Sequence, residues 1–129
     1  VMVERGGVRR GADGLREGLD RVAELEQRFH AGVRVPGDAH GPNAELEKAL
    51  RVNDFFGLAQ LMLRDALARE ESCGAHFREE HQSAEGEARR DDANFAHIAA
   101  WEHQDGADPI RHSEPLQFTA LQPSTRSYK

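Results

Sequence analysis

Histidine, cysteine and carboxylate side chains are the groups in this sequence that could do chemistry. The chain has seven histidines and one cysteine, Cys73. His76 and His81 are five residues apart, which would place them on different faces of a helix. His97 and His103 share a strand parity but would lie about 20 Å apart along an extended chain. Neither spacing is a metal-chelating pattern, so the histidines predict no metal site.

Cys73 and the acids around it are the second candidate for catalysis. Glu70 and Glu71 lie close by, and neighbouring carboxylates disfavour a reactive thiolate. A nucleophilic pair of Cys73 with His76 therefore has little support. Carboxylate pairs of the kind that glycosidases use can be drawn in many ways within residues 70–92, and no spacing selects one. The sequence thus assigns no catalytic, cofactor-binding or metal-binding residue.

The composition of residues 70–92 favours docking instead. This segment holds eight acids and three arginines, and so carries five of the six net negative charges of the chain. Gly74 predicts an unusual backbone conformation there. His76 and Arg78 offer planar donors for carboxylates or carbonyls of another surface. We interpret the segment as a docking loop, with a plain solvated loop as the alternative.

Length and composition limit the classes of protein to which this chain can belong. The chain has 129 residues, of which 38% are hydrophobic and 31% charged, which suits one domain. A single cysteine excludes an internal disulfide and favours a reducing cytoplasm. The net charge of −6 argues against nucleic acid as a partner. Apolar runs long enough for a membrane span are absent, as are the glycine-rich nucleotide fingerprints.

Two helical segments are expected to position this loop. Asp13 is the predicted N-cap of a helix that runs to about Ala31. Apolar side chains recur along it every three or four residues and form one stripe. The stripe consists of Leu15, Leu19, Val22, Leu25 and Phe29. Asn43 is the predicted cap of a second segment that runs to about Arg69.

The second segment changes phase near Asp54. Its first apolar residues and its later ones point nearly opposite ways at 100° per residue, which predicts either a kinked helix or two short helices. The later part is apolar almost all round and indicates a central helix that is covered on several sides. The second face consists of Phe55, Leu58, Ala59, Met62, Leu63 and Ala66. Because only one other clear helix is present, a third partner is missing or comes from elsewhere.

The C-terminal part of the chain predicts a small antiparallel sheet. Residues 94–103 resemble a strand, and residues 109–112 and 116–121 are expected to complete the sheet, with Pro115 at an edge or a strand start. Helices first and strands second indicate an α+β fold. We expect residues 1–70 to form the helical part and residues 71–129 the loop and sheet part of the same domain.

Two short motifs resemble a known family. Residues 71–80 read Glu-Ser-Cys-Gly-Ala-His-Phe-Arg-Glu-Glu, and residues 90–95 read Arg-Asp-Asp-Ala-Asn-Phe. They are similar to the C-terminal region of the flavoprotein subunit of succinate dehydrogenase and fumarate reductase, whose pattern is E-S-R-G-A-H-x-R, a spacer, then R-D-D-x-N-[FW]. Cys73 stands where many members have arginine. This cysteine form and the Ala100-Trp101-Glu102 sequence resemble the menaquinone-linked branch, and the ending 122–129 resembles the C-terminus of the family.

The resemblance implies an antiparallel, spectrin-repeat-like helical bundle whose first helix is truncated, so that residues 1–7 are the end of that helix. The full subunit would bind FAD covalently, oxidise succinate to fumarate and pass electrons through an iron–sulfur subunit to quinone. These residues would carry no FAD and no catalytic group, and the fragment alone would be inactive. L-aspartate oxidase, which shares a similar loop, and a stand-alone acidic protein-interaction module are the alternatives.

The resemblance also implies partners and a location. The loop would dock on the FAD-binding and capping domains of the same subunit, next to the iron–sulfur subunit and, indirectly, a cytochrome b membrane anchor. The complex would lie on the cytoplasmic face of the cell membrane. The expected docking residues are Glu71, Ser72, Gly74, His76, Arg78, Arg90, Asp91 and Asp92.

Overall fold

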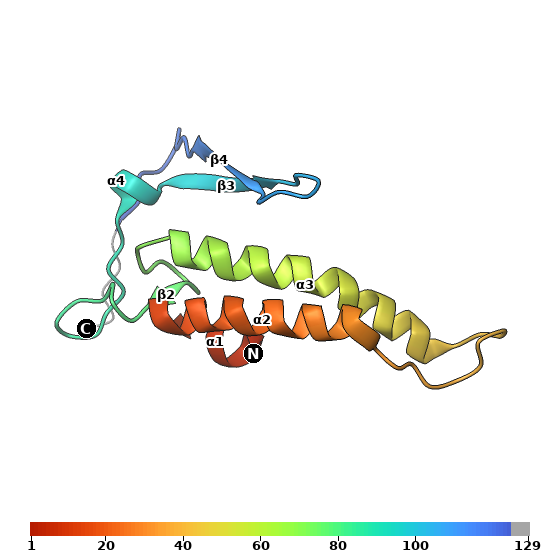
Figure 1. Ribbon diagram of the computed structural model, residues 1–129. Helices are drawn as coiled ribbons and strands as arrows, with labels where there is room; N and C mark the ends of the chain where they lie inside the picture. The colour runs from red at the N-terminus through yellow and green to blue at the C-terminus, as the bar shows by residue number, and fades with distance from the viewer. Residues whose placement is uncertain (125–129) are drawn as a thin grey trace.

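Two long antiparallel helices form the body of the molecule (Figure 1). The computed structural model describes residues 1–124. Helix α2 spans Ala12–Gly32 and helix α3 spans Ala44–Ala68. A single helical turn, α1 (Met2–Arg5), lies against α2. The expected α+β architecture is confirmed, with helices in the first half and strands mainly in the second.

The helix ends differ in part from the prediction. Asn43 is confirmed as the cap of α3, because its side-chain oxygen accepts hydrogen bonds from the N–H groups of Glu45 and Leu46. The prediction of Asp13 as the cap of α2 is wrong, since α2 begins at Ala12 after Gly11. Of the two alternatives for the segment around Asp54, two short helices are wrong, because α3 is one continuous helix.

The core lies where α2 crosses the C-terminal half of α3. Leu15 and Val22 of α2 are buried there against Leu63 and Ala66 of α3. Partly buried apolar side chains extend this cluster, namely Val1, Met2, Leu19, Phe56, Ala59 and Leu67. The predicted stripe on α2 is therefore confirmed at Leu15, Leu19 and Val22, whereas Leu25 is 40% exposed.

Within residues 1–124, helix α3 is not covered on several sides as expected. Phe55 is 59% exposed, and Leu58 and Met62 are each 53% exposed. The change of phase along α3 reflects its neighbours, because only its C-terminal half packs on the core of α2. Apolar residues elsewhere on the helix lie at the surface.

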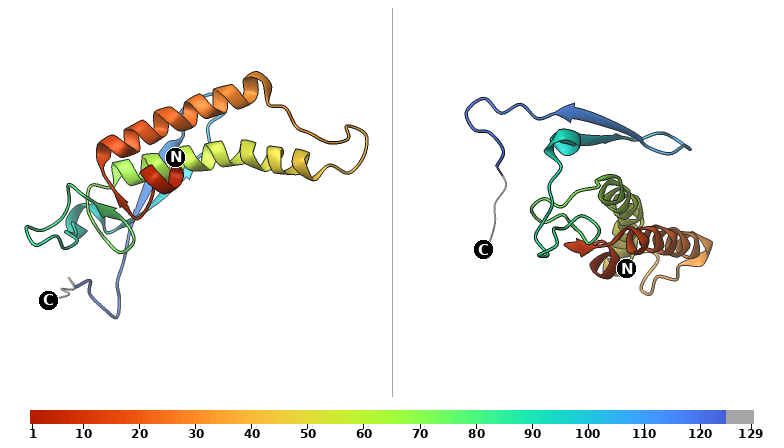
Figure 2. Two further views of the ribbon diagram at one scale, coloured as in Figure 1. Left: turned by 90° about the horizontal axis from the view of Figure 1, so that it is seen from below. Right: turned by 90° about the vertical axis from the view of Figure 1, so that its left-hand side faces the viewer.

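A β-hairpin stands on the other side of α3 from α2 (Figure 2). It pairs β3 (His97–Glu102) with β4 (Ile110–Pro115) in antiparallel register, with Trp101 opposite Arg111. The predicted strand start at residue 94 is wrong, because Asp92–Phe95 forms a short helix, α4. Residues 116–121 are not a strand. Pro115 ends β4, which is an edge strand of this two-stranded sheet, so the expected edge position of Pro115 is confirmed.

A second, very short sheet ties the start of the chain to the acidic loop. Strand β1 (Arg9–Arg10) runs parallel to β2 (Phe77–Arg78), a pairing that the sequence did not predict. Among the helices of residues 1–124, none is both long and apolar enough to cross a bilayer. The expected division of the chain at residue 70 stays a prediction. The last residues of its second part, 125–129, lie outside the described part of the chain.

Candidate functional site

The first motif folds into a tight turn. Cys73 and His76 exchange backbone hydrogen bonds of 2.8 and 3.1 Å across Gly74 and Ala75. Gly74 has φ +58°, a conformation in which glycine lacks the steric penalty of other residues. The unusual backbone geometry expected at Gly74 is therefore confirmed. Gly74 and Ala75 form the exposed tip of the loop.

Ser72 and Glu71 anchor this turn from inside. Ser72 is fully buried; its hydroxyl accepts from the N–H of Arg78 at 2.8 Å and lies 3.1 Å from the carbonyl of Arg78. Glu71, 1% exposed, binds Arg69 with one carboxylate oxygen and accepts from the N–H of Asp91 with the other, at 2.8 Å. The two motifs that are separate in the sequence are thus joined through the Glu71 carboxylate.

Arg78 caps the C-terminus of α3. Its side chain is only 3% exposed, and one guanidinium nitrogen donates to the carbonyls of Ala66, Leu67 and Arg69 at 2.9, 3.0 and 3.3 Å. These carbonyls belong to the helix end, where they lack partners within the helix and carry partial negative charge. The planar donor expected to face another surface is therefore directed at the chain's own backbone.

Glu80 caps the N-terminus of α2 in the same network. Its carboxylate accepts from the N–H of Ala12 and pairs with Arg78 at 3.3 Å. Burial by itself would raise the pKa of Glu80, but the Ala12 hydrogen bond and the Arg78 charge lower it overall. One ion pair therefore joins the end of α3 to the start of α2, and it explains why Asp13 is not needed as a cap.

His76 lies in positively charged surroundings. One ring nitrogen is 2.9 Å from the carbonyl oxygen of Arg69, which makes the ring N–H the donor. Burial lowers the pKa of His76, and the charges of Arg10, Arg69 and Arg78 lower it further, against the effect of this hydrogen bond. The neutral imidazole is thus favoured, and the ring serves to hold the loop on the end of α3.

The second motif organises the turn into the hairpin. Asp91 caps α4 by accepting from the N–H of Asn94, and its other oxygen accepts from the Asn94 side chain at 2.8 Å. Arg90 pairs with Asp92 at 2.6 Å, and this hydrogen bond raises the pKa of Arg90. These three residues are less buried than Glu71 and Arg78. Both motifs are therefore brought together at one end of the molecule.

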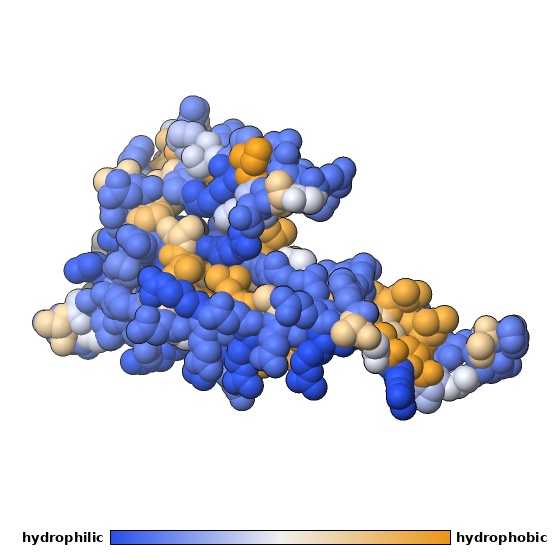
Figure 3. Space-filling model, viewed as in Figure 1, coloured by the Kyte–Doolittle hydropathy of each residue, from blue (hydrophilic) through white to orange (hydrophobic). Residues whose placement is uncertain are grey.

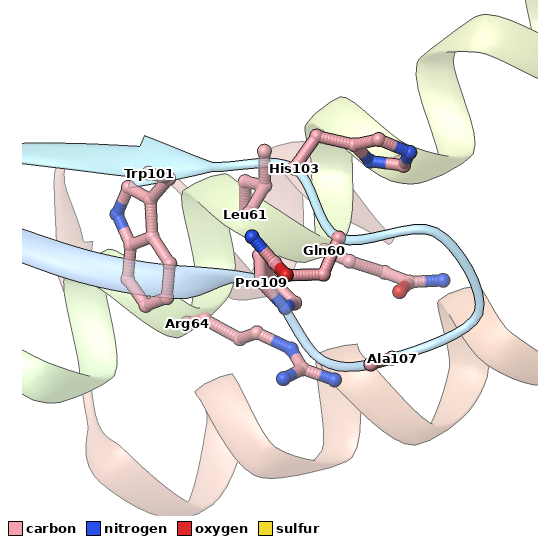
Figure 4. A pocket seen from close by; sticks show the side chains of 9 residues that line it. Gln60, Leu61, Arg64, Trp101, His103, Ala107 and Pro109 are labelled. Atoms are coloured by element: carbon pink, nitrogen blue, oxygen red, sulfur yellow. The ribbon is translucent and has the colours of Figure 1, made fainter.

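Two cavities, one at the hairpin and one beside the motifs, lack the walls that a flavin needs. A cavity of about 250 Å³ lies between α3 and the hairpin tip and is bordered by Leu61, Arg64 and Trp101 (Figure 4). Another beside the motifs, about 580 Å³, is lined mainly by polar and charged side chains such as Arg89 and Asp91. Neither offers the enclosed apolar walls that suit a flavin ring. Residues 1–124 also contain no cluster of three ligands for a metal.

Comparison with known proteins identifies the family to which this chain belongs. A family model described as "Fumarate reductase flavoprotein C-term" matches residues 1–128. The chain belongs to this family. Fumarate reductase flavoprotein subunits from Escherichia coli and from a Serratia strain are both 33% identical, over 99% of this chain, and the match covers 20% and 21% of their lengths. The chain therefore spans about a fifth of these relatives.

Solved structures agree with this family. A variant of the quinol fumarate reductase of E. coli superposes with a TM-score of 0.78 at 30% identity, covering 96% of this chain and 20% of that one. A quinol-fumarate reductase solved with menaquinol molecules gives the same TM-score at 28% identity. L-aspartate oxidase 2 of Ralstonia nicotianae is 36% identical, but over only 63% of this chain.

Sequence reasoning found the loop but missed how it is used. It did not foresee that Glu80 caps α2, because the two partners are 68 residues apart and nothing local signals the contact. It also missed Arg10, which β1 places beside His76. The consecutive acids Glu79 and Glu80, which follow Arg78 directly, were the available sign that an acid could bond within the chain.

Proposed function

We propose that this chain acts as the C-terminal domain of an FAD-dependent flavoprotein subunit that interconverts succinate and fumarate. The match over residues 1–128 to the C-terminal family model is the observation that carries the proposal. The same motifs that define the resemblance also join α2, α3 and the hairpin in the structure. In this proposal the residues described here supply structure, and the flavin is held by another part of the polypeptide.

The domain is proposed to dock through its loop on the FAD-binding and capping domains. Gly74, His76 and Asp92, which are at least partly accessible, would make the contacts. Glu71 and Arg78, which are buried, would shape the loop from inside. An iron–sulfur subunit, and through it a cytochrome b anchor, would take the electrons at the cytoplasmic face of the membrane. The similarity of this chain to solved quinol fumarate reductases supports this assembly.

The function of the chain by itself can be tested directly. The purified 129-residue chain should be colourless and should not reduce an artificial electron acceptor with succinate, because the proposal assigns the flavin to another part of the polypeptide. Bound flavin in the visible spectrum, or succinate-dependent dye reduction above a heat-treated control, would overturn the proposed division of roles.

The L-aspartate oxidase reading is the second candidate. It is supported by the partial match of 36% identity over 81 residues, whereas the fumarate reductase relatives match 99% of the chain. The two readings differ in substrate. Succinate-dependent turnover by the natural flavoprotein that contains this sequence would support the first, and aspartate-dependent peroxide formation would support the second.

A further inference from the structure

A groove runs between α3 and the hairpin, and His76 is the one residue of the docking motifs that lines it. It has a volume of about 370 Å³, and its apolar lining comes chiefly from Leu58 and Met62 of α3 and Trp101 of β3. Leu58 and Met62 are each 53% exposed. Figure 3 shows hydrophobic residues gathered on the body below the hairpin, where the surface is hollowed. We call this cavity the hairpin groove.

Arg10 makes one end of the hairpin groove cationic. The Arg10 guanidinium donates to the carbonyls of Val8 and Ala75, at 3.4 and 3.3 Å, and no carboxylate of residues 1–124 pairs with it. Burial lowers the pKa of Arg10, and the nearby charge of Arg78 lowers it further. The neighbouring Arg9, by contrast, has a carboxylate partner 2.7 Å away. A partly buried cation is therefore left with carbonyl partners alone.

Asp65, the acid that lines the hairpin groove, already has a hydrogen-bond donor and a cation as partners. One carboxylate oxygen of Asp65 accepts from the indole N–H of Trp101 at 3.1 Å and lies 3.5 Å from Nε of Arg111. The charge of Asp65 is therefore balanced by Arg111, whereas no acid in the described part of the chain forms an ion pair with Arg10. This positive end occurs in a chain whose net charge is −6, so it is a local feature that the overall composition does not predict.

We propose that the hairpin groove docks an acidic segment of a partner protein, with a carboxylate paired to Arg10 and an adjacent apolar side chain on Leu58 and Met62. An arginine–carboxylate pair is the strong pairing that the unmatched guanidinium lacks. A protein segment fits better than a small molecule, because small-molecule sites enclose most of their ligand whereas Leu58 and Met62 remain half exposed. The groove adds a contact to the docking role proposed above and rests on that role.

Trp101 makes the proposal testable on the chain itself. It is the only tryptophan in the sequence and it lines the groove, so its fluorescence reports binding there. The probes are two peptides, acetyl-Leu-Glu-Leu-amide and acetyl-Leu-Gln-Leu-amide, which differ in one charge. We expect the Glu peptide to bind about fivefold or more tightly than the Gln peptide at low salt, and the difference to shrink as salt is added.

Three variants separate the Arg10 contact from other effects. Arg10→Gln should bind both peptides equally, whereas Arg10→Lys should keep a reduced preference for the Glu peptide. Arg34→Gln, which removes an exposed arginine from the loop after α2, should leave the preference unchanged. Circular dichroism of each variant checks that the fold is retained; if Arg10→Gln unfolds, the Arg10→Lys comparison and the salt dependence decide the question.

Several results would overturn the docking groove. Equal binding of the two peptides by the unmodified chain would do so, as would a preference that survives in folded Arg10→Gln. No change of Trp101 fluorescence at millimolar peptide would also contradict it. These outcomes concern the chain alone, so they are distinct from a failure of the proposed flavoprotein function, which would appear in the flavin content and substrate turnover of the natural flavoprotein.

Discussion

Replacing Arg78 with methionine should destabilise the chain far more than a typical arginine substitution. Methionine keeps much of the apolar stem but removes the guanidinium that donates to the carbonyls of Ala66, Leu67 and Arg69. It also removes the cation that pairs with Glu80, the cap of α2. The end of α3 therefore loses its donor, and the Glu80 cap of α2 loses the cation that pairs with it.

The expected loss in the free energy of unfolding follows from the burial of Arg78 and from the number of polar groups left without a partner. A charged hydrogen-bonding group contributes about 1.5–3 kcal/mol, and breaking a buried charged pair costs about 3–5 kcal/mol. Arg78 is 3% exposed, but Glu80 is 44% exposed and is solvated after the change, which favours the lower part of that range. We expect a loss of about 3 kcal/mol, a large share of the 5–15 kcal/mol that is typical of a domain.

Urea unfolding followed by circular dichroism measures this loss. Arg9→Met is the matched control, because Arg9 lies on β1, which pairs with β2, and its pair with Glu79 is exposed at both ends. Exposed pairs contribute about 0–1 kcal/mol, so this control should be nearly neutral. If Arg78→Met lowers the free energy of unfolding by no more than Arg9→Met, the capping role of Arg78 is refuted.

Three further predictions concern the core, the loop and pH. Leu63→Ala should cost about 2–5 kcal/mol because Leu63 is fully buried, whereas Phe55→Ala should cost clearly less because Phe55 is 59% exposed; thermal melts that rank them the other way would contradict this core. Gly74→Ala should destabilise by about 1 kcal/mol because of its positive φ, and an unchanged melting temperature would argue against that turn. Burial lowers the pKa of His76 below 6.5, so the unfolded chain binds more protons and stability should fall as pH drops below about 6.5. His76→Gln should flatten that part of the profile, and an identical profile would refute the assignment.

Features encoded by neighbouring residues could be predicted from the sequence. Asn43 caps α3 through N–H groups two and three residues away, so the signal is local. Leu15 and Val22 are buried as the three-to-four spacing indicates, because a helix with one apolar stripe buries it. The turn at Gly74 is likewise a property of the residue itself.

Features that depend on distant contacts could not be predicted. Asp13 looked like a cap, yet Glu80 supplies that role from the other half of the chain. The burial of Arg78 depends on β2 pairing with β1, and two-residue strands leave no period in the sequence. The orientation of a polar loop therefore could not be read from its composition, and neither could the unmatched charge of Arg10.

The most direct test of the central claim is the flavin content of the natural polypeptide that contains this sequence. An antibody raised against the 129-residue chain would isolate that polypeptide from cells, and a denaturing gel would show whether its band carries flavin fluorescence. The account predicts a flavin-bearing band several times larger than 14.4 kDa, together with succinate-dependent dye reduction by the isolated complex. A band of 14.4 kDa without flavin, and no turnover of succinate or fumarate, would contradict it.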